Sequence, residues 1–291
     1  MSQVLTLIAK PLTDGHVRDA RACLPGDVTV HWLAPGQACD LRFDGPGLGI
    51  EASVRGVLGD APVDLFCQRD LPARRRTLLI ADMDSTIITV ECIDEMADMI
   101  GLKAEVAAIT ERAMAGHLGF DAALRERAAM LAGLPIADLR AVYDQRIRLT
   151  PGARELVATM KAHGAVTALV SGGFTYFTER VAAAVGFDHN QANVLNIADD
   201  RLVGTVGEPI LGSGEKLAAL RSLSAQHQIS PHGALAVGDG ANDLEMVEAA
   251  ALGVAFHAKP LLARAADAQI EHGDLTALLY LQGYQADEFR S

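Results

Sequence analysis

Asp82 and Asp84 are two positions apart and directly follow the apolar run at residues 77–81. In an extended chain, side chains two positions apart point to the same side, so both carboxylates can face one ligand. Carboxylates this close share a local field, and one of them tends to hold a proton. The pair therefore suits phosphoryl transfer, in which an ionised Asp82 attacks phosphorus and forms an aspartyl phosphate. Asp84 would protonate the leaving alkoxide and then accept a proton from water.

Ser85 and Thr86 complete this first segment and add hydroxyl and backbone N–H donors for phosphate oxygens. A solvated acidic turn that caps a helix is the simpler interpretation of such residues. A buried strand that runs directly into Asp-x-Asp-Ser-Thr is hard to explain in that way, so we favour catalysis.

Two further segments offer donors for an anion. Ser171, Gly172 and Gly173 follow the apolar run at residues 165–170, and glycine lets the backbone approach an anion closely. Lys216 lies near the start of a predicted helix, after a glycine-rich stretch, and its ammonium suits a phosphate charge. Taken alone, the first of these segments is as typical of an ordinary turn, and a lone lysine is more typical of a helix surface.

The fourth segment carries Asp239, Asn242 and Asp243 among glycines, again after an apolar run. Magnesium is usually held by one or two carboxylates together with substrate oxygens and water. Asp82 and Asp239 would supply the carboxylates, and the backbone carbonyl of Asp84 a further ligand. Asp243 would hold a coordinated water or steer a ligand. The glycines alone would fit a simple loop, but the acidic side chains favour a metal site.

Each of these segments comes where a predicted strand ends or a predicted helix begins. Residues 88–149 carry helical periodicity without strand signals, whereas strands and helices alternate after Pro151. This alternation predicts a doubly wound parallel α/β sheet, whose carboxyl edge binds ligands. We expect a catalytic domain at 77–291, with the helices at about 88–149 inserted as a cap. Within it, residues 191–206 are predicted to form a hairpin.

Residues 1–70 follow another pattern and predict a small separate domain. Residues 69–76, which include Arg74, are polar and contain Pro72, so we interpret them as a solvated linker. The predicted order is βαββαβ, which is typical of a ferredoxin-like α+β fold. The strands are expected at 3–9, 28–32, 40–43 and 63–68, and the helices at 14–24 and 47–58.

Composition excludes several classes of protein. The formal net charge of -12 repels nucleic acid and anionic membranes, so we expect neither as a partner. The four cysteines lack metal-ligand spacing, and no secretory signal or membrane-spanning run is visible. We therefore expect free thiols and a cytoplasmic location. The charge also means that phosphate binding needs a metal or local cationic groups.

The four segments, in this order, resemble the four motifs of the haloacid dehalogenase superfamily of phosphatases. The resemblance covers about residues 77–260, and the combination is far more specific than any one segment. It implies a HAD-like fold with a cap, Mg2+ as cofactor, and phosphomonoester hydrolysis through an aspartyl phosphate. The N-terminal pattern resembles ACT-type regulatory domains, which leaves open amino-acid binding, dimerisation or simple packing against the catalytic unit.

The resemblance is closest to those members that act on phosphoserine, as the last step of serine biosynthesis. They use a glutamate and a cap arginine to hold the amino and carboxylate groups of serine, and Glu91 and Arg127 occupy the matching positions. Phe120 and Met114 match apolar residues that close over the substrate. By residue type alone, a helix-start acid, a surface arginine and ordinary cap core are the simpler interpretations. Spacing from Asp82 favours substrate binding.

The leading hypothesis is hydrolysis of phosphoserine to serine and phosphate. One rival is the same chemistry on another phosphomonoester or acceptor, such as a sugar phosphate or phosphotransfer to homoserine. Glu91 and Arg127 disfavour a sugar phosphate, which lacks the zwitterion they would hold. A second rival is an amino-acid sensor that has lost catalysis, which the intact acidic set disfavours. The predicted catalytic residues are Asp82, Asp84 and Lys216, the predicted metal ligands are Asp82, Asp84 and Asp239, and the supporting residues are Ser85, Thr86 and Asp243. The predicted substrate-binding residues are Glu91, Met114, Phe120, Arg127, Ser171, Gly172, Gly173, Lys216 and Asn242.

Overall fold

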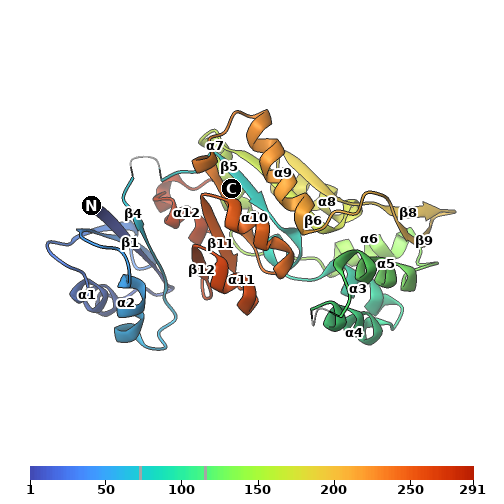
Figure 1. Cartoon of the computed structure of the whole chain (residues 1–291), viewed down its shortest axis with the longest axis horizontal. Helices are drawn as coiled ribbons and strands as arrows, with labels where there is room; N and C mark the ends of the chain where they lie inside the picture. Colours follow the sequence, from blue (N-terminus) through green and yellow to red (C-terminus); the bar gives the residue numbers. More distant parts are fainter. Residues whose placement is uncertain (72–73, 115–116) are drawn as a thin grey trace.

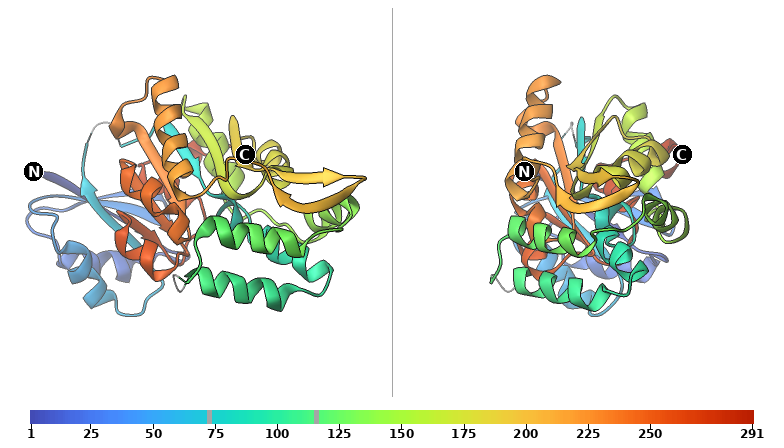
Figure 2. Two further views of the ribbon diagram at one scale, coloured as in Figure 1. Left: turned by 45° about the vertical axis from the view of Figure 1, so that its right-hand side comes forward. Right: turned by 90° about the vertical axis from the view of Figure 1, so that its right-hand side faces the viewer.

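The computed structural model describes residues 1–71, 74–114 and 117–291. Its N-terminal part is a four-stranded antiparallel sheet, and the rest is built on a six-stranded parallel sheet (Figure 1). A group of helices lies beside the parallel sheet, at the end of the molecule away from the N-terminal part (Figures 1 and 2). The predicted α/β architecture with inserted helices and a preceding α+β unit is confirmed.

The N-terminal sheet has the strand order β2-β3-β1-β4. Leu5, Leu7 and Leu41 of the sheet pack with Val17 and Val54 of the two helices in one apolar cluster, so both helices cover the same face. The first helix begins where the Thr13 hydroxyl accepts a 3.2 Å bond from the His16 N–H. The elements are β1 (Ser2–Ile8), α1 (Asp14–Ala22), β2 (Thr29–Ala34), β3 (Ala38–Asp44), α2 (Ile50–Leu58) and β4 (Asp64–Arg69).

The parallel sheet has the order β12-β11-β10-β5-β6-β7. Its central strand β5 (Leu78–Ala81) is fully buried, as expected for a strand covered on both faces. The register pairs Ala81 with both Leu169 and Val237, so β5, β6 and β10 end at the same edge. The other strands are β6 (Val166–Phe174), β7 (His189–Asn193), β10 (Ala234–Gly238), β11 (Leu252–Phe256) and β12 (Ala268–Ile270).

Helices cover both faces of this sheet. Because side chains alternate along a strand, Leu79 of β5 joins the cluster of α7, α8 and α12, whereas Ile80 joins that of α9, α10 and α11. No helix in the described ranges is long and apolar enough to span a bilayer. The covering helices are α7 (Ala153–Ala162), α8 (Thr175–Val185), α9 (Ser213–Gln226), α10 (Leu244–Ala249), α11 (Pro260–Ala265) and α12 (Ala277–Leu281).

The inserted helices leave and rejoin the sheet through two neighbouring linkers. Ile88 and Leu149 form an antiparallel bridge, and the Thr89 N–H donates to the Arg148 carbonyl at 3.0 Å. The Thr150 N–H donates to the Ile87 carbonyl at 2.9 Å. Both ends of the insertion are thus held together at one point. The helices are α3 (Cys92–Met99), α4 (Lys103–Met114), α5 (Phe120–Met130) and α6 (Ile136–Gln145).

The predicted hairpin at 191–206 is wrong only at its start, residues 191–193. Residues His189–Asn193 form β7 at the edge of the parallel sheet, and only β8 (Leu195–Ala198) and β9 (Arg201–Val206) form the hairpin. The hairpin packs against the inserted helices, where a Cβ on Gly204 would lie 2.8 Å from Ala132 Cβ. Polar residues in β7 hid its membership of the sheet, because an edge strand is only half covered.

The interpretation of residues 69–76 as a solvated linker is also wrong for Arg74. Its guanidinium is 7% exposed and donates to Asp40 Oδ2 at 2.6 Å, while Asp40 is fully buried. The Thr6 hydroxyl donates to Asp40 Oδ1 at 2.7 Å, and Arg74 Nη2 donates to the Leu281 carbonyl at 3.1 Å. The pair joins the N-terminal sheet to α12 of the larger unit.

Arg74→Met should destabilise the full chain by about 3–5 kcal/mol, because it leaves the Asp40 carboxylate buried without a counter-ion. Urea denaturation followed by circular dichroism would measure this loss. Arg18→Met is the matched control, since the Arg18 side chain is 77% exposed beside Asp19. Equal stability of the two variants would contradict the importance of the Arg74–Asp40 pair.

Candidate active site

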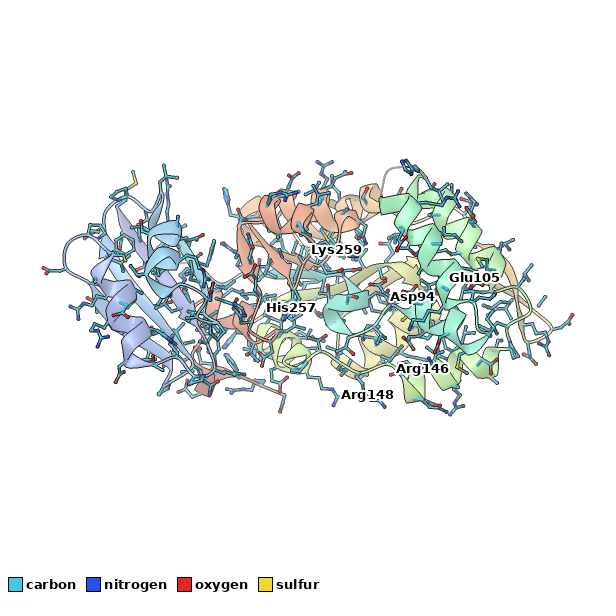
Figure 3. All side chains as sticks on the ribbon, turned by 90° about the horizontal axis from the view of Figure 1, so that it is seen from below. Asp94, Glu105, Arg146, Arg148, His257 and Lys259 are labelled. Atoms are coloured by element: carbon cyan, nitrogen blue, oxygen red, sulfur yellow. The ribbon has the colours of Figure 1, made fainter. Side chains whose placement is uncertain are left out.

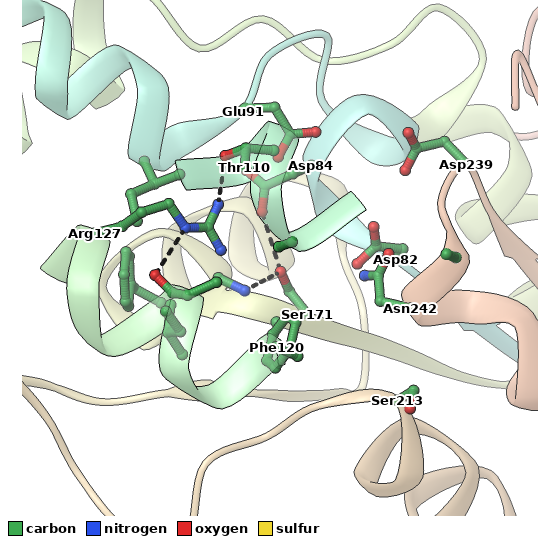
Figure 4. Close-up of a pocket in the computed structure, with 18 of the residues that line it drawn as sticks. Asp82, Asp84, Glu91, Thr110, Phe120, Arg127, Ser171, Ser213, Asp239 and Asn242 are labelled. Atoms are coloured by element: carbon green, nitrogen blue, oxygen red, sulfur yellow. Dashed lines mark hydrogen bonds between the residues drawn. The ribbon is translucent and has the colours of Figure 1, made fainter. Parts of the chain in front are cut away.

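A pocket of about 350 Å³ lies between the carboxyl edge of the parallel sheet and the inserted helices (Figure 4). Asp82 follows β5, Ser171 lies near the end of β6, and Asp239 follows β10. All three line the pocket, because these neighbouring strands end at one edge. The first, second and fourth sequence segments are therefore brought together as predicted.

Lys216 lies between two buried carboxylates. Its Nζ is 2.5 Å from Asp82 Oδ1 and 2.6 Å from Asp243 Oδ1, and its side chain is fully buried. Burial lowers the pKa of Lys216, but Asp243 and Asp82 raise it by more, so the pKa lies above its ordinary value. Lys216 is therefore a cation at neutral pH. Because an ammonium has three donors, one N–H remains for a ligand oxygen.

Asp243 has a structural role that the sequence did not reveal. Its Oδ1 contacts Lys216, while its Oδ2 accepts bonds from the N–H groups of Asp239 at 3.2 Å and Gly240 at 3.1 Å. The carboxylate lies so close to β10 that a Cβ on Gly238 would be 2.3 Å from Asp243 Cγ. Glycine is needed there for close approach, and Asp243 fixes the loop that carries Asp239.

Asp82, Asp239 and Asp243 form an acidic cluster suited to a divalent cation. One carboxylate oxygen from each lies within 4.8 Å of the others, and this is the one such group in the part of the chain that the structure describes. Burial and Asp243 raise the pKa of Asp239 to about 7. Burial, followed by Asp243, also raises the pKa of Asp82 well above its ordinary value, against the effect of Lys216. A cation would favour the ionised forms, so the donor set fits a hard metal ion.

Asp84 is held by donors on two elements. Its Oδ1 accepts from the Cys92 N–H at the start of α3 at 2.8 Å, and its Oδ2 accepts from the Ser171 hydroxyl at 3.1 Å. Burial and Glu91 raise the pKa of Asp84 to about 6, although these two bonds act in the opposite direction. A Cβ on Gly173 would lie 2.7 Å from Asp84 Oδ2. Asp84 is thus fixed in place with a pKa near the neutral range, as a proton-transfer group requires.

Ser85 and Thr86 do not line the pocket, in contrast to the expectation that they supply phosphate donors. Ser85 has the left-handed φ of 56°, and its hydroxyl donates to Glu91 Oε1 at 2.6 Å. The Thr86 side chain is fully buried, and within the described residues its hydroxyl has no hydrogen-bond partner. Both side chains therefore lie outside the pocket, in the segment that follows Asp84.

Asn193, at the end of β7, joins the end of β6 to the segment before α9, and sequence reasoning missed it. Its Nδ2 donates to the carbonyls of Gly172 at 2.8 Å and Leu211 at 3.1 Å. Its Oδ1 accepts from the Leu211 N–H at 2.6 Å, and the side chain is buried. Asn193 thereby sets the position of Gly172 relative to the chain that leads to Lys216.

The inserted helices contribute Glu91, Arg127 and Phe120 to the same pocket. Arg127 donates to the Thr110 hydroxyl and to the Ala123 carbonyl, both at 3.3 Å (Figure 4). Burial lowers the pKa of Arg127, and nearby carboxylates, including Glu91, oppose this effect. A carboxylate and a guanidinium thus occupy one wall, opposite in charge and both available to a polar ligand.

Phe120 covers the pocket where two glycines allow it. A Cβ on Gly172 would lie 2.9 Å from Phe120 Cζ, and one on Gly212 would lie 3.2 Å from Phe120 Cδ1. Asn242 also lines the pocket, as expected. The side chain of Met114, another predicted substrate contact, lies outside the described residues.

Lys259 is a pocket residue that sequence reasoning did not select. Its Nζ is 3.8 Å from Asp239 Oδ2, and its backbone N–H donates to the Asp239 carbonyl at 2.8 Å. Its position between the end of β11 and Pro260 could have identified it as a pocket residue, because this is again the ligand-binding edge of the sheet.

Comparisons with known proteins agree with this geometry. Residues 79–248 match the family model of haloacid dehalogenase-like hydrolases. A phosphoserine phosphatase from Albidiferax ferrireducens is 47% identical over 209 residues, which covers 70% of this chain and 88% of the relative. A solved HAD-family hydrolase from Salmonella enterica has a TM-score of 0.87 and 31% identity, covering 96% of this chain and 98% of that one. A solved phospho-aspartyl intermediate analogue of phosphoserine phosphatase has a TM-score of 0.67 and 38% identity, covering 71% and 98%.

A divalent cation should stabilise the chain through the acidic cluster. At a cation concentration about 100 times the dissociation constant, the free energy of unfolding should rise by about 2.7 kcal/mol. Urea denaturation with the cation or with EDTA would measure this difference. Asp239→Asn should lose most of the gain, whereas Asp27→Asn, at an exposed N-terminal site, should keep it. An undiminished gain in Asp239→Asn would place the cation elsewhere.

Proposed function

Because this chain belongs to the haloacid dehalogenase-like hydrolases, we propose that it hydrolyses O-phospho-L-serine to L-serine and phosphate, as the last step of serine biosynthesis. One observation carries the proposal. A single pocket joins Asp82, which contacts the buried cation Lys216, to the oppositely charged side chains Glu91 and Arg127. The first pair suits a phosphate ester, and the second suits the ammonium and carboxylate groups of serine. Relatives named phosphoserine phosphatase support this substrate.

In the first step, a carboxylate oxygen of Asp82 attacks phosphorus and the bond from phosphorus to the serine oxygen breaks. Asp84 gives its proton to that oxygen as it leaves. Its pKa of about 6 leaves part of the population protonated near neutral pH, which suits this role. The products of the step are serine and an aspartyl phosphate on Asp82.

In the second step, water attacks the phosphorus of the aspartyl phosphate. Asp84, now ionised, accepts the proton of that water, and the bond between phosphorus and the Asp82 oxygen breaks. Phosphate is released, and both aspartates return to their starting forms. The bonds from Cys92 N–H and the Ser171 hydroxyl hold Asp84 in one position throughout.

We propose Mg2+ as the divalent cation, held by the side chains of Asp82 and Asp239 and by the backbone carbonyl of Asp84. Oxygen donors of this kind suit Mg2+. When bound, it would neutralise the negative charge of the phosphate group. Asp243 would act indirectly, by holding the Asp239 loop and Lys216.

Lys216, Ser171 and the following glycines would hold the phosphate oxygens. Lys216 does not itself line the pocket but contacts Asp82, so its remaining N–H would reach a phosphate oxygen beside that carboxylate. The backbone N–H of Gly172 in β6 would be a further donor, and Asn242 completes the wall. Glu91 would bind the ammonium of serine and Arg127 its carboxylate. Phe120, with Met114, would close over the substrate and exclude water.

The N-terminal residues are proposed to be regulatory. We divide the chain into an ACT-like domain at 1–70 and a catalytic domain at 77–291 with its cap at about 88–149. An amino-acid effector at the N-terminal domain and a homodimer follow from the ACT-like pattern, and light scattering on the full chain would test the latter. The four free cysteines support a cytoplasmic location.

Asp82→Asn should abolish hydrolysis of L-phosphoserine, because the amide cannot form the acyl phosphate. The rate of phosphate release with Mg2+ should fall by at least about 10⁴-fold, as for other lost nucleophiles. Asp19→Asn, on α1 with its side chain 47% exposed, should leave the rate unchanged. Substantial turnover by Asp82→Asn would contradict the proposed mechanism.

Arg127→Ala should raise KM for L-phosphoserine by about tenfold to a hundredfold, equivalent to lost hydrogen bonds to a charged group. KM for p-nitrophenyl phosphate, which has no carboxylate, should change little. A panel with phosphothreonine and a sugar phosphate would define the preference. Arg125→Ala is the control on the same helix, since that side chain is 51% exposed and pairs with Glu208. An unchanged substrate profile in Arg127→Ala would contradict the proposed specificity.

A further inference from the structure

A second cavity, of about 520 Å³, lies where the N-terminal sheet, the cap linkers and the C-terminal segment meet. We call it the interdomain cavity. Its walls include Ile8 and Lys10 from the N-terminal part, Thr89 and Thr150 from the two cap linkers, and Asp274 near the C-terminus. Among the described residues, it shares none with the active-site pocket. The chain from Asp82 to Glu91 nevertheless contributes to both.

We propose that the interdomain cavity binds a small organic carboxylate, and that the bound carboxylate weakens substrate binding by competing with Glu91 for the hydroxyl of Ser85. This inference rests on the proposed function of Glu91 as the partner of the serine ammonium. It assigns a regulatory ligand to the space between the N-terminal domain and the cap linkers.

Hydrogen-bond donors on the wall of the cavity favour an anion. Lys10 Nζ is 2.8 Å from Asp274 Oδ2, and Asp274 Oδ1 also accepts from the Thr276 N–H at 2.9 Å. The one acidic side chain that the described residues bring to the wall is therefore already engaged, whereas the Lys10 ammonium has further N–H donors. The imidazoles of His257 and His272 also line the wall, and His257 lies on the side of the parallel sheet that faces the N-terminal domain (Figure 3).

The remainder of the wall suits a carbon skeleton. Ile8 and Phe256 are buried apolar side chains, and Tyr280 lies beside them with its ring largely buried. A ligand that places a carboxylate near Lys10 would direct its apolar part along these residues. A compact aliphatic carboxylate meets both requirements, whereas a neutral ligand would leave the ammonium without a new partner.

Ser85 connects the cavity to the active site. It lines the interdomain cavity, and its hydroxyl donates to Glu91 Oε1 at 2.6 Å. A serine hydroxyl has a single proton to donate, so an anion in the cavity and Glu91 are alternative acceptors. Ser85 also holds a left-handed φ of 56°, a conformation that surrounding contacts must maintain. Glu91 would lose its fixed position when the hydroxyl turns to the ligand.

The cap linkers give the ligand a second contact, at the base of the inserted helices. Thr89 and Thr150 both line the cavity, and their backbone N–H groups form the bonds that join the two linkers. A ligand in the cavity therefore touches the N-terminal domain and the base of the cap at once. The effect should appear in KM, because the reacting groups Asp82 and Asp84 do not line this cavity.

Three variants of the full chain test the proposal with 4-methylpentanoate as the probe, its neutral amide as the charge control, and L-leucine as the matched amino acid. Calorimetric titration would measure binding, and steady-state kinetics would measure KM for L-phosphoserine. In the wild type, the carboxylate should bind, the amide should not, and KM should rise by about fivefold or more at saturation, the lower end of typical coupling between sites. A lower dissociation constant for L-leucine than for 4-methylpentanoate would identify the ligand as an amino acid.

Lys10→Met should weaken carboxylate binding by about tenfold or more, because a charged hydrogen bond is lost. Asp274→Asn should strengthen it, since Lys10 loses its neutralising partner while Thr276 keeps an acceptor. Mere loosening of the domain contact would weaken binding in both variants. Ser85→Ala should itself raise KM, because Glu91 loses its hydrogen-bond donor. It should keep most of the carboxylate binding, which depends on Lys10, but bound carboxylate should then have no further effect on KM.

Binding that is absent in the wild type, or unaltered by Lys10→Met, would overturn the proposal. A purely competitive effect that persists in Ser85→Ala would place the probe in the active site instead and would also overturn it. Failure of the proposed function is distinguishable, because the calorimetric comparison of Lys10→Met with Asp274→Asn needs no turnover of phosphoserine.

Discussion

The burial of several carboxylates at one sheet edge is the constraint on which the rest of the site depends. Asp82, Asp239 and Asp243 meet where water is largely excluded, and uncompensated charges there would be strongly unfavourable. Lys216 contacts two of them, and a divalent cation suits the remaining charge. The glycine at 238 is required because Asp243 must lie against β10. The same charges that would oppose folding thus create a place suited to a divalent cation.

The sequence was sufficient to predict this edge because its signals are local. Each chemical segment directly follows a short apolar run, and parallel strands end at a common edge, so Asp82, Ser171 and Asp239 were expected to meet. The helical periodicity of residues 88–149 likewise predicted the inserted helices. Glu91, Phe120 and Arg127 were located by resemblance to a family, since nothing in their residue types distinguishes them from ordinary helix residues.

The remainder depends on partners that are distant in the chain. Arg74 looked solvated because its counter-ion, Asp40, belongs to another sheet and its carbonyl partner lies near the C-terminus. Asn193 lies in a polar edge strand without clear periodicity, yet its amide joins Gly172 of β6 to Leu211, before α9. Ser85 was expected to face a phosphate, but its hydroxyl is taken by Glu91. Side-chain hydrogen bonds of this kind are set by tertiary position, which no local pattern encodes.

The antiparallel bridge between Ile88 and Leu149 has a consequence for how such proteins diversify. An inserted segment whose two ends are neighbours can be lengthened, exchanged or deleted without altering the strands on either side of it. The sheet and its acidic edge would then be inherited unchanged from a common ancestor. Different insertions at this junction would place different side chains around the phosphate ester. Selection can therefore change the inserted segment at this one junction without altering the reacting groups.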